Sequence, residues 1–345
     1  MKIALVTDAW VPQVNGVVRT LQQMVKMLRA EGHVVEVISP DRFYTIPCPG
    51  YAEIRLAVAP WQLNRLMDKF APDAVHIATE GPLGWAGRRW CSKRGVTFNS
   101  SFHTRFPDYV AVRTGISPDW IWPIMRRFHA PSNRVLVATQ GLGEELQAHG
   151  IKRVHRWTRG VDLARFSPDN PKLPSFDGLM HPIQLYVGRV AVEKNIEAFL
   201  DNTHAGSKVV VGDGPAFDVL RARYPQTLFT GALDGDALAS AYASADVFIF
   251  PSLTDTFGLV MIEALASGVP VAAFPVHGPI DVVGLAGTGT VDGFNAPIGA
   301  LDESIEAAIA QALMCTPSDC VAYAAHFSWD NSYQQFSSAV CAIAA

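Results

Sequence analysis

The sequence has no long uninterrupted hydrophobic run. Its longest apolar stretch, Leu259–Val276, is broken by Glu263, Gly268 and two prolines, which predicts a helix, a turn and a strand instead of a membrane span. At the N-terminus the apolar run ends at Asp8, too early to form the core of a signal peptide. We therefore expect a cytoplasmic protein.

Cysteine is also scarce. The five cysteines are scattered and lack the spacing of a metal site, which is typical of reduced thiols in a cytosolic protein. No low-complexity segment or repeat is present, and a composition of 49% hydrophobic and 17% charged residues is that of a globular enzyme. Because 345 residues exceed what one hydrophobic core usually organises, two domains are expected.

Basic residues are scarce in the second half of the chain. Residues 1–170 contain 22 Lys and Arg against 14 Asp and Glu, a net charge of +8, whereas residues 171–345 contain 6 against 18, a net charge of −12. The basic half suits an anionic surface such as a membrane. Uneven surface charge without any partner is the alternative interpretation, and the composition favours neither.

Short β-branched segments alternate with helical ones in both halves, which predicts parallel sheets with crossover helices. A Pro- and Gly-rich segment at 167–182 separates the two halves. We expect an α/β fold of two Rossmann-like doubly wound domains, 1–171 and 172–329, that face a central cleft, with the C-terminal helix 330–345 joining the first domain. The expected strands cover residues 3–7, 34–38, 74–77, 96–99, 135–138 and 154–157, then 184–187, 208–211, 227–229, 247–250 and 269–274.

The segment 251–272 predicts a strand end, a loop and a helix that begins near Gly258. The N–H groups at such a helix start form an anion site. Asp255 in the loop and Glu263 in the helix are carboxylates that suit sugar hydroxyls. The alternative makes Asp255 a helix cap and Glu263 a solvated residue, but the apolar neighbours of Glu263 favour a carboxylate with a partner.

Two cations follow the first strand of the second half. Arg189 comes directly after Gly188 at the predicted strand end, and Lys194 opens the next helix. A planar guanidinium and a mobile ammonium together suit a diphosphate, which they hold and stabilise as it leaves. Their position at a strand end favours this interpretation over two unrelated surface charges.

Taken in order, these motifs resemble the retaining GT-B glycosyltransferases of family 4. The resemblance implies transfer of a sugar from a nucleotide diphosphate donor, with no metal or other cofactor. The segment 101–104, followed by Phe106 and Pro107, resembles the corresponding segment in the subgroup that builds sulfoquinovosyl, glucosyl, glucuronosyl or mannosyl lipids. The matching motifs span almost the whole chain and lie at 15–17, 101–104, 159–162, 188–194, 211–215, 250–252, 255–263 and 266–271.

The resemblance also implies roles for individual residues. Asp255 and His103 would contact the donor sugar, Glu263 would hold the ribose hydroxyls, and Gly16 would let the backbone approach the phosphates. Asp255 stands where the family usually has glutamate, so its reach is one methylene shorter. The implied catalytic set is His103, Arg189, Lys194 and Asp255, and the donor-binding set is Gly16, Gly188, Arg189, Lys194, Gly258, Leu259 and Glu263.

Two further features bear on the mechanism. Asp234–Gly235–Asp236 has the spacing of a metal-binding DxD motif, but it opens a helix after a strand, so helix capping is the better interpretation and no metal is expected. No residue stands out as the base that inversion requires. This is consistent with retention, in which the leaving diphosphate helps to remove the acceptor proton and the protein stabilises its charge.

One aromatic and basic segment suggests the acceptor. Trp120, Ile121 and Trp122 precede Arg126 and Arg127, a combination that suits a bilayer interface, although a core helix with a charged outer face is the alternative. A second such patch, with two tryptophans and four basic residues, lies at 85–94. With the net charge of +8, these patches favour a lipid acceptor and peripheral binding to the anionic inner face of the cytoplasmic membrane. Nucleic acid is not expected as a partner.

The expected reaction is transfer of a hexose or hexuronate from UDP-glucose or UDP-glucuronate to a lipid such as diacylglycerol, which forms an α-glycolipid. Arg105, two residues after His103, suggests a hexuronate because a guanidinium pairs with a carboxylate. The first alternative is a GDP-mannose-dependent α-mannosyltransferase that acts on a lipid or a soluble glycan. A UDP-sugar epimerase of the same architecture and a non-catalytic nucleotide-sugar-binding subunit are the others.

Overall fold

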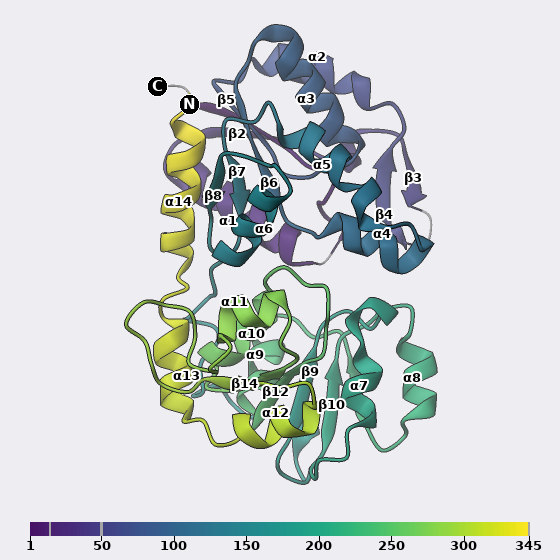
Figure 1. Ribbon diagram of the computed structural model, residues 1–345, viewed down its shortest axis with the longest axis vertical. Coiled ribbons are helices and arrows are strands. Elements are labelled where there is room, and N and C mark those ends of the chain that lie inside the picture. Colours follow the sequence, from purple (N-terminus) through teal and green to yellow (C-terminus); the bar gives the residue numbers. More distant parts are fainter. Residues whose placement is uncertain (14, 49–50, 344–345) are drawn as a thin grey trace. The chain divides into compact units, whose positions relative to one another are not determined.

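The computed structural model describes residues 1–13, 15–48 and 51–343 (Figure 1). The chain forms two compact units: unit 1 comprises residues 1–159 and 329–345, and unit 2 comprises residues 160–328. Each unit contains a parallel six-stranded sheet with helices, so the expected α/β fold of two doubly wound sheets is confirmed. The Pro- and Gly-rich segment belongs to unit 2, where Phe176 is buried and the Leu173 N–H donates to the Ser244 hydroxyl.

The sheet of unit 1 has the strand order β2-β1-β5-β6-β7-β8. Its strands are β1 (Lys2–Val6), β2 (Val34–Ile38), β5 (Ala74–Ile77), β6 (Phe98–Phe102), β7 (Val135–Val137) and β8 (Val154–Arg156). Its helices are α1 (Gly16–Ala30), α2 (Leu63–Phe70), α3 (Pro82–Arg94), α4 (Phe106–Thr114), α5 (Trp122–His129), α6 (Gln140–Ala148) and α14 (Trp329–Cys341), with 3₁₀ turns η1 (Pro40–Arg42), η2 (Pro60–Gln62) and η3 (Pro118–Trp120).

Strand β1 shows why both faces of this sheet are covered. Successive side chains of a strand point to opposite faces. Ile3 and Leu5 pack into one apolar cluster with α1 and α14, whereas Ala4 and Val6 pack into another with α2 and α3. The continuous apolar run at 3–6 is therefore that of a strand buried on both sides. Figure 1 shows α14, at the yellow end of the colour scale, beside this sheet.

The sheet of unit 2 has the strand order β11-β10-β9-β12-β13-β14. Its strands are β9 (Gln184–Val187), β10 (Lys208–Val211), β11 (Leu228–Gly231), β12 (Val247–Phe250), β13 (Val271–Ala273) and β14 (Gly299–Leu301). Its helices are α7 (Ile196–Asp201), α8 (Phe217–Arg223), α9 (Gly235–Ala243), α10 (Leu259–Ala266), α11 (His277–Val283), α12 (Ile305–Ala312) and α13 (Pro317–Ala324), with 3₁₀ turns η4 (Pro174–Phe176) and η5 (Val192–Lys194).

The sequence patterns missed three strands. An antiparallel pair, β3 (Thr45–Cys48) with β4 (Tyr51–Ala57), lies outside the parallel sheet of unit 1, and its mixed polar and apolar residues gave no strand signal. The third is β14, which has three residues and begins with a glycine. Each expected strand overlaps an observed one, and their ends differ by at most three residues.

Candidate active site

The topology of unit 2 places two loops at the centre of its sheet. Strands β9 and β12 are parallel neighbours, and the strand order reverses between them. Ligands of open α/β sheets bind beyond the carboxyl ends of the strands at such a reversal. The loop after β9 carries Arg189 and Lys194, and the loop after β12 carries Asp255. All three residues thus lie at this edge of the sheet, and Lys194 contacts Asp255 there.

Close backbone contacts fix the position of Arg189. The hydroxyl of Tyr186 donates a hydrogen bond to the Arg189 carbonyl oxygen at 2.8 Å. Burial raises the pKa of Tyr186 well above its usual value, so the hydroxyl remains a donor. A Cβ atom on Gly188 would lie 2.9 Å from this hydroxyl, and one on Gly212 would overlap the carbonyl group of Gly188. Both positions therefore require glycine.

Lys194 and Asp255 form an ion pair. The Lys194 ammonium lies 2.7 Å from both carboxylate oxygens of Asp255, and the two side chains are 25% and 26% exposed. Burial favours the protonated form of Asp255, but the charge and hydrogen bonds of Lys194 outweigh it and lower the pKa of the carboxyl. The site therefore presents a carboxylate and an ammonium that has one more N–H to donate.

Gly258 lies at the start of α10 in a left-handed conformation, with φ of +78°. A Cβ atom there would lie 2.8 Å from Cζ of Phe250. The backbone of α11 also approaches this loop closely, because a Cβ on Gly278 would lie 2.6 Å from the carbonyl oxygen of Asp255. The first N–H groups of a helix lack carbonyl partners within that helix, so the start of α10, at Leu259, offers hydrogen-bond donors beside Asp255.

Glu263, one turn into α10, is only 7% exposed. The hydroxyl of Tyr242, on α9, donates to its Oε2 atom at 3.0 Å. The alternative interpretation of Glu263 as a solvated residue is therefore wrong. The side chain is instead a buried carboxylate with a hydrogen-bond partner in the same unit.

The predicted residues of unit 1 lie at the ends of two of its strands. Gly16 begins α1, the helix that follows β1, and Asn15 caps this helix by accepting the Val18 N–H at 3.0 Å. His103 directly follows β6 and is 7% exposed. Its Nδ1 atom lies 2.9 Å from Nη2 of Arg159. Burial, the charge of Arg159 and the neighbouring His76 together lower the pKa of His103 well below its usual value.

Asp8 is a buried carboxylate at the carboxyl end of β1 that the sequence analysis did not select. Its Oδ1 accepts the Leu83 N–H at 2.9 Å, and its Oδ2 accepts the Gly84 N–H at 3.2 Å and the Thr79 hydroxyl at 2.9 Å. It thus caps the start of α3 from a distant strand, where Gly81 has no side chain to do so. Burial raises its pKa to about 6 against the lowering effect of these hydrogen bonds. An acidic residue just after a buried strand was the available signal.

Arg105 is engaged within unit 1, which removes the structural reason to expect that it recognises an acidic sugar. Its guanidinium makes two hydrogen bonds to Glu145, at 2.8 and 2.7 Å, and a third to Asp108 at 2.5 Å. Its side chain is 14% exposed. Two carboxylates of its own unit therefore already neutralise this cation.

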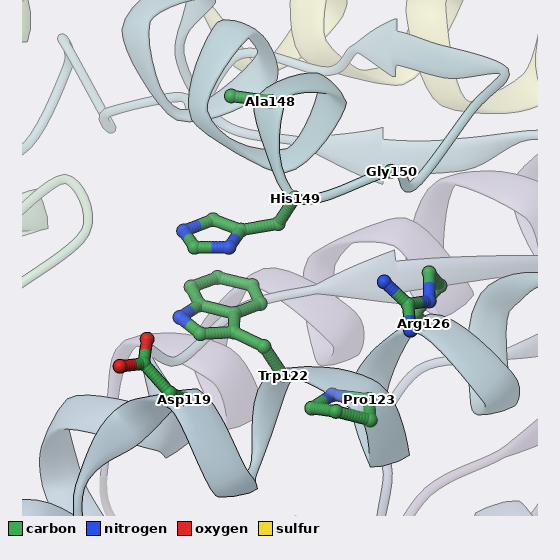
Figure 2. A pocket seen from close by; sticks show the side chains of 7 residues that line it. All are labelled: Asp119, Trp122, Pro123, Arg126, Ala148, His149 and Gly150. Carbon is green, nitrogen blue, oxygen red and sulfur yellow. The ribbon is translucent and has the colours of Figure 1, made fainter.

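The structure also corrects part of the predicted membrane segment. Trp122 is 6% exposed, because its ring stacks on His149 at 3.8 Å between centroids (Figure 2). The same ring also lies nearly parallel to Phe102, with centroids 6.0 Å apart. A ring packed in this way cannot enter a bilayer. Ile121 packs partly against the same apolar cluster. Trp120, in contrast, is 77% exposed, and Arg126 and Arg127 are exposed as well.

The second basic and aromatic patch, at 85–94, is largely engaged within unit 1. Trp90 is 4% exposed and donates to Asp68, which also pairs with Arg94. Arg88 donates to the carbonyl oxygens of Phe128 and Arg127. This patch therefore adds little to any membrane surface.

Neither a metal cluster nor a membrane span stands out in the described part of the chain. Residues 1–13, 15–48 and 51–343 contain no group of three or more His, Cys, Asp or Glu placed to hold a metal ion. Across the same residues, no helix is both long and apolar enough to cross a bilayer. Asp234 occupies the N-cap position of α9, as expected, but its side chain makes no capping hydrogen bond there, and Asp236 is exposed.

Two parallel sheets of this topology, one of them with cations and a helix start at its strand reversal, define a GT-B protein. Solved structures agree. Sucrose-phosphate synthase from Thermosynechococcus elongatus is similar with a TM-score of 0.75 at 21% identity, over 98% of this chain and 97% of that one. The expected GT-B fold is therefore confirmed.

Sequence comparisons give the family. Residues 14–165 match the model described as Glycosyltransferase Family 4, and residues 181–314 match that described as Glycosyl transferases group 1. The "GDP-mannose-dependent alpha-mannosyltransferase" of Mycolicibacterium smegmatis is 35% identical over 87% of this chain and 87% of its own length. The "Alpha-monoglucosyldiacylglycerol synthase" of Streptococcus pneumoniae is 27% identical over 79% of this chain and 71% of its own length.

The chain therefore belongs to glycosyltransferase family 4 and is a retaining hexosyltransferase that uses a nucleotide-sugar donor. The resemblance inferred from the motifs is confirmed. The epimerase and the non-catalytic binding subunit are set aside, because the family is one of sugar-transferring enzymes.

Proposed function

We propose that the protein transfers mannose from GDP-mannose, with retention, to a hydroxyl group of a membrane lipid. The observation that carries the donor is the 35% identity, over most of both chains, to an enzyme named for GDP-mannose. The UDP-glucose interpretation has weaker support, since the glucosyl relative is 27% identical. The hexuronate interpretation has lost its structural argument because Arg105 is paired with Glu145 and Asp108. The mannosyl alternative thus becomes the main proposal.

The loop after β9 and the start of α10 would bind the donor diphosphate. Arg189 and Lys194 supply two cations, and the N–H groups of Gly258 and Leu259 add the positive end of a helix. These groups would stabilise the negative charge that grows on the departing diphosphate. Glu263, held by Tyr242, would accept hydrogen bonds from the ribose hydroxyls. In unit 1, Gly16 opens α1 without a side chain that would obstruct the phosphates.

Asp255 and His103 would contact the donor sugar. The lowered pKa of Asp255 keeps it an acceptor for sugar hydroxyls at neutral pH. Its ion pair with Lys194 would compensate for a side chain shorter than glutamate, because the ammonium fixes the position of the carboxylate. The acceptor oxygen would attack the anomeric carbon on the face from which the diphosphate leaves. Its proton would pass to a departing phosphate oxygen.

The exposed residues around η3 and α5 support a lipid acceptor. Trp120 and Ile124 are 77% and 46% exposed, and Arg126 and Arg127 are exposed on the same helix. Unit 1 as a whole carries 21 Lys and Arg against 13 Asp and Glu, a net charge of +8. Apolar side chains that enter the interface and cations that bind anionic headgroups, at about 1 kcal/mol each, are sufficient for reversible docking.

A donor panel tests the reaction. The purified enzyme is incubated with GDP-mannose, UDP-glucose or UDP-glucuronate and a lipid extract, and products are identified by mass spectrometry. We expect a mannosylated lipid from GDP-mannose and at least tenfold lower kcat/KM with either UDP-sugar. A preference for UDP-glucose would overturn the donor, and transfer to soluble glycans alone would overturn the acceptor.

Vesicle co-sedimentation tests the surface. We expect binding to vesicles that contain anionic lipid, weaker binding at high salt, and loss of binding in the combined variant Trp120→Ala, Arg126→Ala, Arg127→Ala. Trp61→Ala is the matched control, because Trp61 is 66% exposed in η2 of the same unit. If the combined variant sediments as the wild type does, this surface is not the docking site.

A further inference from the structure

His103 and Arg159 form a buried pair in unit 1. His103 follows β6 and Arg159 follows β8, and the two residues are 7% and 5% exposed. Nη2 of Arg159 lies 2.9 Å from Nδ1 of His103. Because the pair is shielded from water, solvent molecules do not compete for this hydrogen bond.

Arg159 is itself held in place by Trp157. Its Nη1 donates to the Trp157 carbonyl oxygen at 2.9 Å, and its guanidinium carbon lies 4.5 Å from the centre of the indole ring. Trp157 is fully buried and donates its Nε1–H to the Ser332 hydroxyl on α14 at 3.1 Å. The His103 ring also packs against this indole in a T-shaped arrangement, with centroids 5.5 Å apart. The guanidinium therefore approaches the imidazole from one fixed direction.

The donor and acceptor roles follow from the chemistry of the two groups. A guanidinium has N–H donors and no acceptor, so Nδ1 of His103 must be the accepting nitrogen. Burial lowers the pKa of Arg159 only to about 9, and the guanidinium is therefore still charged at neutral pH. A neutral imidazole carries one N–H, and with Nδ1 accepting, that hydrogen is on Nε2.

The surroundings also keep the imidazole neutral. Burial, the charge of Arg159 and the nearby His76 ring all lower the pKa of His103, and Nε2 of His76 lies 2.9 Å from the Ser101 hydroxyl. Burial lowers the pKa of His76 to about 3, so this ring is neutral too. A proton added to His103 would therefore create a buried cation next to a second one, which is unfavourable.

We propose that Arg159 is a positioning residue that fixes His103 as the Nε2–H tautomer, so that His103 donates a hydrogen bond to an oxygen of the nucleotide-sugar donor and removes no proton. This inference rests on the proposed role of His103 at the donor sugar. It adds that the residue acts as a neutral donor and that Arg159 of the 159–162 motif sets this state. A single donor aimed at developing charge is worth about 10²–10³ in rate, which is the scale of effect to expect.

The first experiment reads the tautomer directly, without turnover. Long-range ¹H–¹⁵N correlation spectra of protein labelled at its ten histidines distinguish Nε2–H from Nδ1–H rings, and the His103 signals are assigned by their loss in His103→Gln. We expect the Nε2–H tautomer in the wild type at pH 8 and through the range around pH 6.5 in which an unperturbed imidazole is protonated. In Arg159→Met we expect a population of Nδ1–H rings and protonation at higher pH. Arg159→Lys, which keeps a cationic donor, should retain the wild-type pattern.

Arg156→Met is the matched control, because it removes an exposed arginine from β8 and should leave the His103 signals unchanged. An Nδ1–H ring in the wild type would overturn the proposal. So would an unchanged tautomer and titration of His103 in Arg159→Met, provided that the variant retains the cooperative unfolding and circular dichroism of the wild type.

Turnover gives the second readout. Glutamine carries an N–H donor but cannot serve as a base, so His103→Gln should keep at least tenfold more kcat than His103→Ala. Equal loss in the two variants would overturn the donor role. The outcomes remain separable from the proposed reaction, because a chain that transfers no mannose would still show the tautomer in its spectrum, and a different nucleotide sugar can then be used for the kinetic comparison.

Discussion

The ion pair between Lys194 and Asp255 gives the sharpest test of the diphosphate site. Lys194→Met removes the ammonium and keeps an unbranched side chain. If Lys194 stabilises the leaving diphosphate, kcat should fall by about 10²–10³, because one electrostatic contact to the transition state is lost. Since a tenfold change in rate corresponds to about 1.4 kcal/mol, the activation barrier rises by about 3–4 kcal/mol.

The same change should also destabilise unit 2, because it leaves Asp255 without its cation. Exposed ion pairs contribute about 0–1 kcal/mol, and removal of one partner from a fully buried pair costs about 3–5 kcal/mol. With side chains that are 25% and 26% exposed, the Lys194–Asp255 pair lies between these limits, so we expect a loss of about 1–2 kcal/mol. Urea unfolding of Lys194→Met measures this quantity.

The double variant Lys194→Met, Asp255→Asn separates the two effects. Neither charge is then left unpaired, so most of the lost free energy of unfolding should return. Turnover should stay at the level of Lys194→Met or below, because the ammonium is still absent. As a control, Arg223→Met breaks the more exposed pair with Glu197 in the same unit, and should change stability by less than about 1 kcal/mol and turnover not at all.

One result would refute the reasoning. If the double variant regains turnover together with stability, Lys194 serves only to neutralise Asp255, and the diphosphate must be held by other groups. A Lys194→Met variant with normal turnover would have the same consequence.

Three further predictions concern other parts of the chain. Gly258→Ala should lower stability by about 2–4 kcal/mol and abolish most turnover, because the alanine would have φ of +78° and a Cβ 2.8 Å from an aromatic ring. The control Gly293→Ala, at φ of +81° with open space around it, should cost only about 1 kcal/mol, and equal urea midpoints for the two variants would contradict this prediction. The pKa of Asp8 is raised from 3.8 to about 6, so between these pH values the folded state binds a proton that the unfolded state does not. The stability of the wild type relative to Asp8→Asn should therefore fall by about 3 kcal/mol as the pH rises through this window. Parallel stability curves for the two proteins between pH 4 and 7 would show that the pKa of Asp8 is not raised. Turnover should survive EDTA, because the segment 234–236 is placed at a helix start; abolition by EDTA and recovery with Mg²⁺ or Mn²⁺ would assign it a metal.

Local patterns in the sequence were sufficient to place most of the strands and the loops of the site. A strand buried on both faces is largely apolar, as in residues 185–187 and 247–250, and a residue that directly follows such a strand must lie at the carboxyl edge of the sheet. For this reason Arg189, Lys194 and Asp255 were recognisable as candidate site residues in the loops after these strands, whereas His103 was selected through the family resemblance. Strands β3 and β14 were missed because their segments, TIPC and GAL, contain a proline or a glycine, residues that are depleted in strands.

Which side chains pair with one another was decided only by the tertiary structure. Lys194 and Asp255 are 61 residues apart, and they meet because the strand order makes β9 and β12 neighbours, which no local pattern encodes. The same holds for Arg105, which the sequence placed near a sugar and the fold paired with Glu145 from α6. Nothing in the sequence distinguishes Trp120 from Trp122, yet Trp122 is buried and Trp120 is exposed. Burial and partnership depend on contacts between distant segments, so the sequence alone determined the kind of chemistry, and the fold determined which residues are available for it.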